Sequence, residues 1–114
     1  MAFVLDDSST YFWPISLQVP VDGGKYKRCD FEVEFQRIPQ SELLELIAAQ
    51  QEGALSDVEI IKKIMVGWKN VTDSEDQEVP FTATNRDQLL EVVGMASAIG
   101  EVFFESRAKA KRKN

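Results

Sequence analysis

The chain has no histidine and a single cysteine, Cys29, among its 114 residues. Histidine is the commonest general base and metal ligand, so its absence weakens the case for most hydrolytic and metal-dependent enzymes. One thiol can form neither an internal disulfide nor a four-thiolate zinc site, which suits a reducing cytosol. No apolar run approaches the roughly 18 residues that a membrane-spanning helix needs. Asp6 and Asp7 stand where a signal peptide needs cations, so we expect a cytoplasmic protein without a membrane partner.

Positive charge is scarce outside the C-terminal end. Five of the 13 cations lie in the last eight residues, which leaves 8 cations against 19 anions, a charge of −11, on the other 106 residues. These five are Arg107, Lys109, Lys111, Arg112 and Lys113. An acidic body makes nucleic acid an improbable partner. The basic end is either a solvated helix terminus placed favourably against the helix dipole, or a site for phosphates or an acidic partner.

A length of 114 residues predicts one domain. Residues 1–10 lack any period, so we expect a flexible arm there. Residues 11–106 form the expected domain, and residues 107–114 the basic tail. A chain of this size buries about two thirds of its surface, which allows a core without disulfides.

The first half of the domain alternates with period two. Apolar residues fall on odd positions from Tyr11 to Val21, and the same alternation returns at Cys29, Phe31, Val33 and Phe35. This is typical of half-buried strands. Asp22-Gly23-Gly24 between them supplies a tight turn, so we predict a β-hairpin over 13–37. Pro14 and Pro20 cannot donate ladder hydrogen bonds, which places the first strand at an edge.

Helical spacing follows the hairpin. Ser41 is a candidate N-cap for a helix with the apolar stripe Leu43, Leu44, Ile47 and Ala48. Ser56 and Glu59 form a capping box for a second helix, which the apolar period extends to Trp68. An exposed acidic loop is expected over 69–79.

Thr84 then caps a third expected helix, which Gly94 ends, and a fourth runs over 95–110. The fold class is therefore α+β, an N-terminal antiparallel β-hairpin packed on about four C-terminal α-helices.

No catalytic or metal site is predicted, and no cofactor. The acidic run at 73–78 lacks the central glycine of an EF-hand loop, so a solvated loop explains it better than a calcium site. Cys29 has no histidine to activate it and lies on the inward face of its strand. We therefore expect a protein that is not an enzyme.

Candidate partner-binding residues come from aromatics that cannot all be buried against one surface. Phe103 and Phe104 are about 100° apart around a helix axis, and Phe104 shares its face with Ser97, Gly100 and Glu101. Either the hairpin wraps round to cover Phe104, or Phe104 contacts another chain. The run Tyr11, Phe12 and Trp13 raises the same question, since neighbours on a strand face opposite ways.

Three pieces of the second half resemble the tail assembly chaperones of long-tailed bacteriophages. They are GWKNVTD (67–73), VPFTATNRDQLL (79–90) and AIGEVFF (98–104). In that family a tryptophan closes one helix, a Pro-Phe-Ser/Thr unit and an Asn introduce a helix with paired leucines, and a last helix ends in aromatics. The matching positions are Trp68, Val71, Pro80, Phe81, Thr82, Asn85, Leu89, Leu90, Ala98, Val102 and Phe103. The family often has Pro-Gly at the helix break, where this chain has Val93-Gly94.

The matching residues also have structural explanations. Pro80 holds the preceding residue extended, and Phe81 anchors the third helix. Asn85 or Thr84 satisfies the free amides at its start. On this interpretation the motif specifies a fold.

The resemblance implies a phage or prophage assembly factor in the host bacterial cytoplasm. Such proteins coat the tape measure protein, keep it soluble and help recruit tail tube subunits, which then displace them, so that they are absent from the mature virion. Many families add a longer, frameshifted form, and homo-oligomers are a further expected partner. Two alternatives remain: a structural tail or head-completion component of a virion, and a small nucleic-acid-binding regulator that uses the basic tail.

Overall fold

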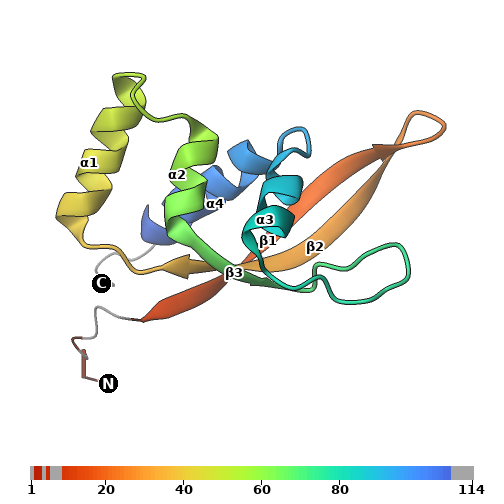
Figure 1. Ribbon diagram of the computed structural model, residues 1–114, viewed down its shortest axis with the longest axis horizontal. Helices are drawn as coiled ribbons and strands as arrows, with labels where there is room; N and C mark the ends of the chain where they lie inside the picture. Colours follow the sequence, from red (N-terminus) through yellow and green to blue (C-terminus); the bar gives the residue numbers. More distant parts are fainter. Residues whose placement is uncertain (1, 4, 6–8, 109–114) are drawn as a thin grey trace.

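The computed structural model describes residues 2–3, 5 and 9–108 and has an α+β arrangement, as predicted. A sheet of three antiparallel strands is combined with four helices (Figure 1). In chain order the elements are β1 (Thr10–Val21), β2 (Lys25–Gln36), α1 (Gln40–Gln51), α2 (Asp57–Ile64), β3 (Met65–Lys69), α3 (Ala83–Leu90) and α4 (Met95–Ala108).

The predicted hairpin is confirmed. β1 and β2 pair in a continuous register in which Ile15 faces Phe31 and Trp13 faces Val33. Gly23 and Gly24 have φ of +84° and +70°, conformations that favour glycine and close the turn between the strands. The strand order β1-β2-β3 leaves β1 at an edge, where its two prolines are tolerated.

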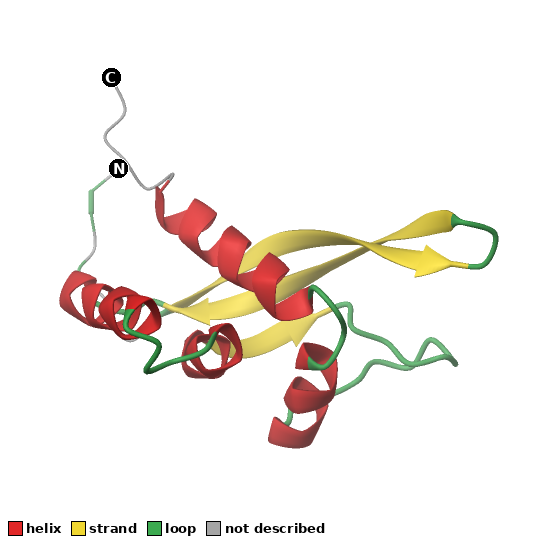
Figure 2. Ribbon diagram, turned by 90° about the horizontal axis from the view of Figure 1, so that it is seen from above, coloured by secondary structure: helices red, strands yellow, loops and turns green. Residues whose placement is uncertain are grey.

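The core lies between the sheet and the helices. Val33, Phe35, Ile64, Ile99 and Phe103 are all fully buried. α4 packs against β1 and against α2. Figures 1 and 2 show the helices gathered over one end of the sheet, while the turn of the β1–β2 hairpin extends beyond them. This arrangement places α2 and α4 side by side.

The predicted extension of the second helix to Trp68 is wrong. α2 ends at Ile64, and Met65–Lys69 forms β3, in which Met65 pairs with Phe35 and Trp68 with Val33. Trp68 therefore does not close a helix, in contrast to the family pattern. Pairing with buried apolar residues of β2 overrides the helical period of the segment. A Cβ on Gly67 would collide with the Glu34 side chain, so a larger residue at this position requires that side chain to move.

Helix starts follow the predictions only in part. The capping box is confirmed, because the Ser56 side chain accepts from the Glu59 amide and Glu59 accepts from the Ser56 amide. Ser41 is not an N-cap: α1 starts after Pro39, without a side-chain cap. Thr82, rather than Thr84, caps α3 and accepts a 3.1 Å hydrogen bond from the Asn85 amide.

Two further details of the helices differ from the predictions. α1 buries Leu43 and Leu46, whereas Leu44 is 54% exposed, so the predicted stripe is rotated on the helix. α3 ends at Leu90, four residues before Gly94, which has φ of +82° and directly precedes α4. The expected arm at 1–10 lies partly outside the described residues, and β1 already begins at Thr10.

Candidate protein-binding groove

A groove of about 450 Å³ lies between α2 and α4. We call it the α2–α4 groove, and its lining residues are Gln50, Asp57, Ile60, Ile61, Ala96, Ser97, Gly100, Glu101 and Phe104. Its floor is apolar, since Ile60 and Ile61 come from the core side of α2 and are almost fully buried. An apolar hollow open to the surface is the ordinary form of a binding site for an apolar ligand or side chain.

The α4 wall follows from helical spacing. Ala96, Gly100 and Phe104 are four residues apart and so lie on one side of the helix. A Cβ on Gly100 would lie 3.8 Å from Cδ1 of Ile61, an ordinary contact distance. The predicted shared face of Phe104, Ser97, Gly100 and Glu101 is therefore confirmed, and the lack of a side chain at Gly100 widens the groove.

A shallower hollow of about 540 Å³ continues the groove toward the α3–α4 connection. The two hollows share Asp57, Ala96 and Ser97. Val92 and Val93 border the second one and are 40% and 96% exposed. Two exposed valines beside an apolar hollow extend the surface that a partner can cover.

The charges around these hollows have one sign. Of the described residues that line them, the charged ones are Asp57, Glu91 and Glu101, and none is Lys or Arg. The Asp57 carboxylate accepts a 2.5 Å hydrogen bond from Nε2 of Gln50, which links the end of α1 to the start of α2. The groove is thus apolar inside and acidic at its rim.

The structure separates the two candidate phenylalanines of α4. Phe104 is partly buried and lines the groove, with its ring centroid 5.4 Å from that of Phe103. Phe103 is fully buried and packs edge-on against Phe35, at 5.1 Å between centroids. Phe103 is therefore a core residue in this monomer, with no surface to offer a partner.

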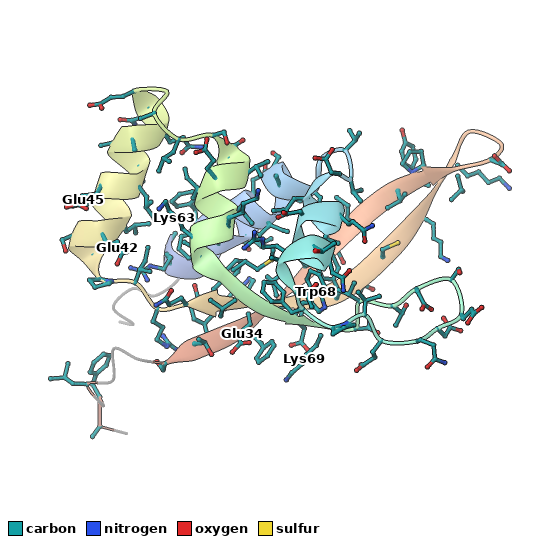
Figure 3. All side chains as sticks on the ribbon, viewed as in Figure 1. Glu34, Glu42, Glu45, Lys63, Trp68 and Lys69 are labelled. Carbon is teal, nitrogen blue, oxygen red and sulfur yellow. The ribbon has the colours of Figure 1, made fainter. Side chains whose placement is uncertain are left out.

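The three aromatics of β1 likewise divide between two faces. Tyr11 and Trp13 face the helices, and the Tyr11 hydroxyl lies 2.8 Å from Oγ of Ser106 on α4. Phe12 lies on the opposite face, where Nζ of Lys69 is 3.8 Å from its ring centroid. Figure 3 shows Lys69 and Glu34 on that side of the sheet. None of the three lines the α2–α4 groove.

Two of the family-motif residues, Trp68 and Phe81, meet Val79 in what we call the aromatic corner (Trp68, Val79 and Phe81), just before α3 begins. Figure 3 labels Trp68. The rings of Trp68 and Phe81 pack edge-on at 4.9 Å, and the Trp68 indole N–H donates a 2.7 Å hydrogen bond to the Val79 carbonyl. The Asn85 side chain donates to the Pro80 carbonyl at 2.9 Å. These contacts hold the connection from β3 to α3.

The remaining motif residues also have structural contacts. The Val71 carbonyl accepts from the Val79 amide at 2.8 Å, which closes the acidic loop. Leu90 is buried, and Leu89, Ala98 and Val102 pack against the core from its edge. The motif stabilises the fold, in agreement with its structural interpretation. None of its residues lines the α2–α4 groove, and Leu90 lines the second hollow.

The acidic loop is an ordered turn. The Asp73 carboxylate accepts hydrogen bonds from the amides of Glu75 and Gln77, at 2.8 and 3.0 Å. Within the described ranges, no group of three or more His, Cys, Asp and Glu is placed to hold a metal ion. Asp73 therefore has a structural role in shaping this loop.

Two carboxyl groups away from the groove have shifted acidities. Hydrogen bonds from Ser16 and then Arg28 lower the pKa of Asp30 on the hairpin. A hydrogen bond from Arg86, aided by the charges of Lys62 and Arg86, lowers the pKa of Asp87 on α3. Both groups are solvent-exposed and belong to surface ion pairs.

The basic tail begins inside α4. Nη1 of Arg107 donates a 3.1 Å hydrogen bond to the Ile38 carbonyl and so ties the end of α4 to the segment after β2. Lys109, Lys111, Arg112 and Lys113 lie outside the described residues.

The sequence did not predict that α2 forms the second wall of the groove, opposite α4, or that the second hollow extends it. The apolar period after the capping box includes Ile60 and Ile61, but it does not indicate that the space above them stays open between α2 and α4. Val92 and Val93 lie in a stretch assigned to the end of a helix, and the only signal for their exposure was their position beside Gly94.

No protein-family model, curated protein or solved structure matches this chain. In the part of the chain that the structure describes, no helix has both the length and the apolar character needed to cross a membrane. The resemblance to tail assembly chaperones therefore rests on the residues quoted for it.

Proposed function

We propose that this chain is a tail assembly chaperone of a long-tailed phage or prophage, and that it binds the tape measure protein without catalysing a reaction. The α2–α4 groove is the observation that carries the proposal, because it is an apolar surface which the monomer leaves open. The motif residues of the resemblance support it, since they hold the connection from β3 to α3, and α3 packs against α4, one wall of this groove.

The mechanism is weak binding repeated along a long client. Each copy seats one apolar segment of the tape measure protein in its groove, beside Phe104. Many such contacts along one filament act together through multivalency, while each copy stays individually displaceable. The acidic body keeps a crowded coat soluble. Tail tube subunits then replace the chaperone in the host cytoplasm, so the finished particle lacks it.

Co-expression tests the proposal directly. The chain is produced together with the tape measure protein of the same genome. We expect the client to become soluble and to co-purify with this chain. A client that stays insoluble, with no complex recovered, would contradict the proposal.

Matched variants connect the result to the groove. Phe104→Ser removes an aromatic side chain from the groove wall, whereas Leu44→Ser removes an apolar side chain that is 54% exposed on α1, outside the groove. We expect loss of the complex with the first and retention with the second. Peptides of this chain in purified particles would instead indicate a structural virion component.

A further inference from the structure

The rim of the α2–α4 groove carries a carboxylate on each of its two walls. Asp57 stands at the start of α2 and Glu101 on α4, while the floor between them is formed by Ile60, Ile61 and the open space at Gly100. A ligand that fills this groove therefore passes between two negative charges.

We propose that the α2–α4 groove binds an amphipathic helix whose apolar stripe is flanked on both sides by Lys or Arg. This inference rests on the proposed function in taking that helix to be a segment of the client. The chemistry of the segment, however, is set by the groove alone.

A helix suits the groove better than an extended strand. Both walls are helices, so no free strand edge borders the floor to pair with a strand's backbone. An extended segment would leave amide and carbonyl groups unpaired against isoleucine side chains, which is costly. A helix satisfies its own backbone and offers only side chains to the floor.

The dimensions set the length of the segment. Ala96 to Phe104 spans nine residues of α4, about 12 Å or just over two turns. The second hollow continues the apolar surface to Val93. A bound helix of about three turns therefore covers both. Gly100 lets that helix approach α4 closely, because helix separation depends on the side chains at the contact.

Charge complementarity determines which residues flank the apolar stripe of the bound helix. A cation on either side of the apolar stripe comes close to Asp57 or Glu101, and Glu91 adds a third negative charge at the extension. A helix with acidic flanks would bring like charges together at a partly desolvated rim, which disfavours binding.

The test uses the full-length chain and three fluorescent 14-residue peptides. They share one Leu/Ala stripe and differ only in flanking residues, which are Lys, Gln or Glu. We expect the Lys peptide to bind at least tenfold more tightly than the Gln peptide by fluorescence anisotropy, and the Glu peptide not to bind. The preference should shrink severalfold between 50 and 500 mM NaCl, because salt screens exposed charges. Equal binding of the Lys and Glu peptides would overturn the proposal.

Variants locate the binding. Gly100→Leu places a side chain in the groove, and Ser97→Arg does so from an exposed position on the same wall, in case the first variant does not fold. Each should weaken the Lys peptide at least tenfold. Glu101→Lys should shift the preference toward the Glu peptide, whereas Glu45→Lys, on the outer side of α1 in Figure 3, should change nothing.

The outcomes separate this inference from the proposed function. If the tape measure protein binds but Ser97→Arg and Glu101→Lys leave its binding unchanged, the client uses another surface and this inference fails alone. If the Lys peptide binds as expected but the tape measure protein does not, the groove is as inferred and the client is a different helical protein. Self-association that Ser97→Arg abolishes would make a second copy the occupant and overturn the inference.

Discussion

The aromatic corner and the α2–α4 groove each contain an aromatic side chain near a glycine, but the surroundings of the two aromatic side chains differ. In the corner, Trp68 meets Phe81 ring to edge and its indole N–H reaches a carbonyl. In the groove, Phe104 meets Phe103 on one side and an open hollow on the other. The rings of Trp68, Phe81 and Phe104 are all partly buried, and Trp68 and Phe81 also line a small hollow, of about 280 Å³. The difference is that the Trp68 ring is held by a hydrogen bond as well as by a ring contact, whereas Phe104 borders the larger, apolar groove.

The two glycines show the same contrast. At Gly67 a Cβ would run into the Glu34 side chain, which would have to move to admit any larger residue. At Gly100 a Cβ would meet only Ile61, at 3.8 Å, so the fold does not require glycine there. A glycine that the fold does not need, beside a partly buried aromatic, fits a surface kept open for binding. The aromatic pairs and the glycines together suggest that stability depends on the corner and binding on the groove.

The largest expected difference is between the two aromatics. Trp68→Ala removes a ring pair and leaves the Val79 carbonyl without its donor, which should lower the free energy of unfolding by about 3 kcal/mol. Phe104→Ala should lower it by about 1 kcal/mol, because part of the ring already faces the hollow. Urea denaturation measures both values. An equal loss for the two variants would show that Phe104 is a structural residue and break the comparison.

The glycine substitutions should have opposite signs. Gly67→Ala forces Glu34 aside and should destabilise the protein by about 1 kcal/mol. Gly100→Ala should stabilise it by about 0.5–1 kcal/mol, because alanine has the higher helix propensity. Thermal unfolding of the two variants against the wild type measures the signs. Destabilisation by Gly100→Ala would mean that this wall is packed more tightly than its 3.8 Å spacing indicates.

The cap of α3 provides a sharper test within the corner. Thr82→Ala removes the acceptor of the Asn85 amide and should cost about 1 kcal/mol of unfolding free energy. Thr84→Ala, two residues further on and exposed, should cost nothing or stabilise slightly through helix propensity. Chemical denaturation of this matched pair distinguishes the observed cap from the one predicted by sequence. Equal effects would argue against the Thr82 cap.

The smallest expected effect on stability concerns the ion pair between α2, a wall of the groove, and α3, which follows the aromatic corner. Nζ of Lys62 on α2 lies 3.5 Å from the Asp87 carboxylate on α3. The folded protein lowers the pKa of Asp87 below 3.8 through the Arg86 hydrogen bond, with a smaller contribution from Lys62. The ionised form is therefore favoured by folding, so this contribution is present above pH 3.8 and is lost as the pH falls below it.

Asp87→Asn tests that pH dependence. The variant should be slightly less stable than the wild type at neutral pH, and the difference should vanish below the lowered pKa of Asp87. Asp30→Asn, on the hairpin, is a second test of the same effect. It should show the same pH dependence, because Ser16 and Arg28 lower the pKa of Asp30. A difference that persists unchanged to low pH would exclude a role for the charge.

Local signals explain which features the sequence predicted correctly. Alternation with period two and the Asp-Gly-Gly turn specified the hairpin, and the capping box specified the start of α2. Both depend on neighbours within a few residues of each other. The extension of the second helix to Trp68 was wrong, because β3 exists only through its pairing with a strand about 35 positions earlier.

The sequence by itself determined the α+β class, the hairpin, and the placement of Phe104 and Gly100 on the same face of the last helix. Only the tertiary structure decided that Phe103 is buried, that Met65–Lys69 is a strand, and that α2 and α4 leave a groove between them. The physical reason is the distance along the chain over which each kind of interaction acts. Turn, cap and periodicity energies act between near neighbours, whereas the position of a groove depends on how distant elements pack.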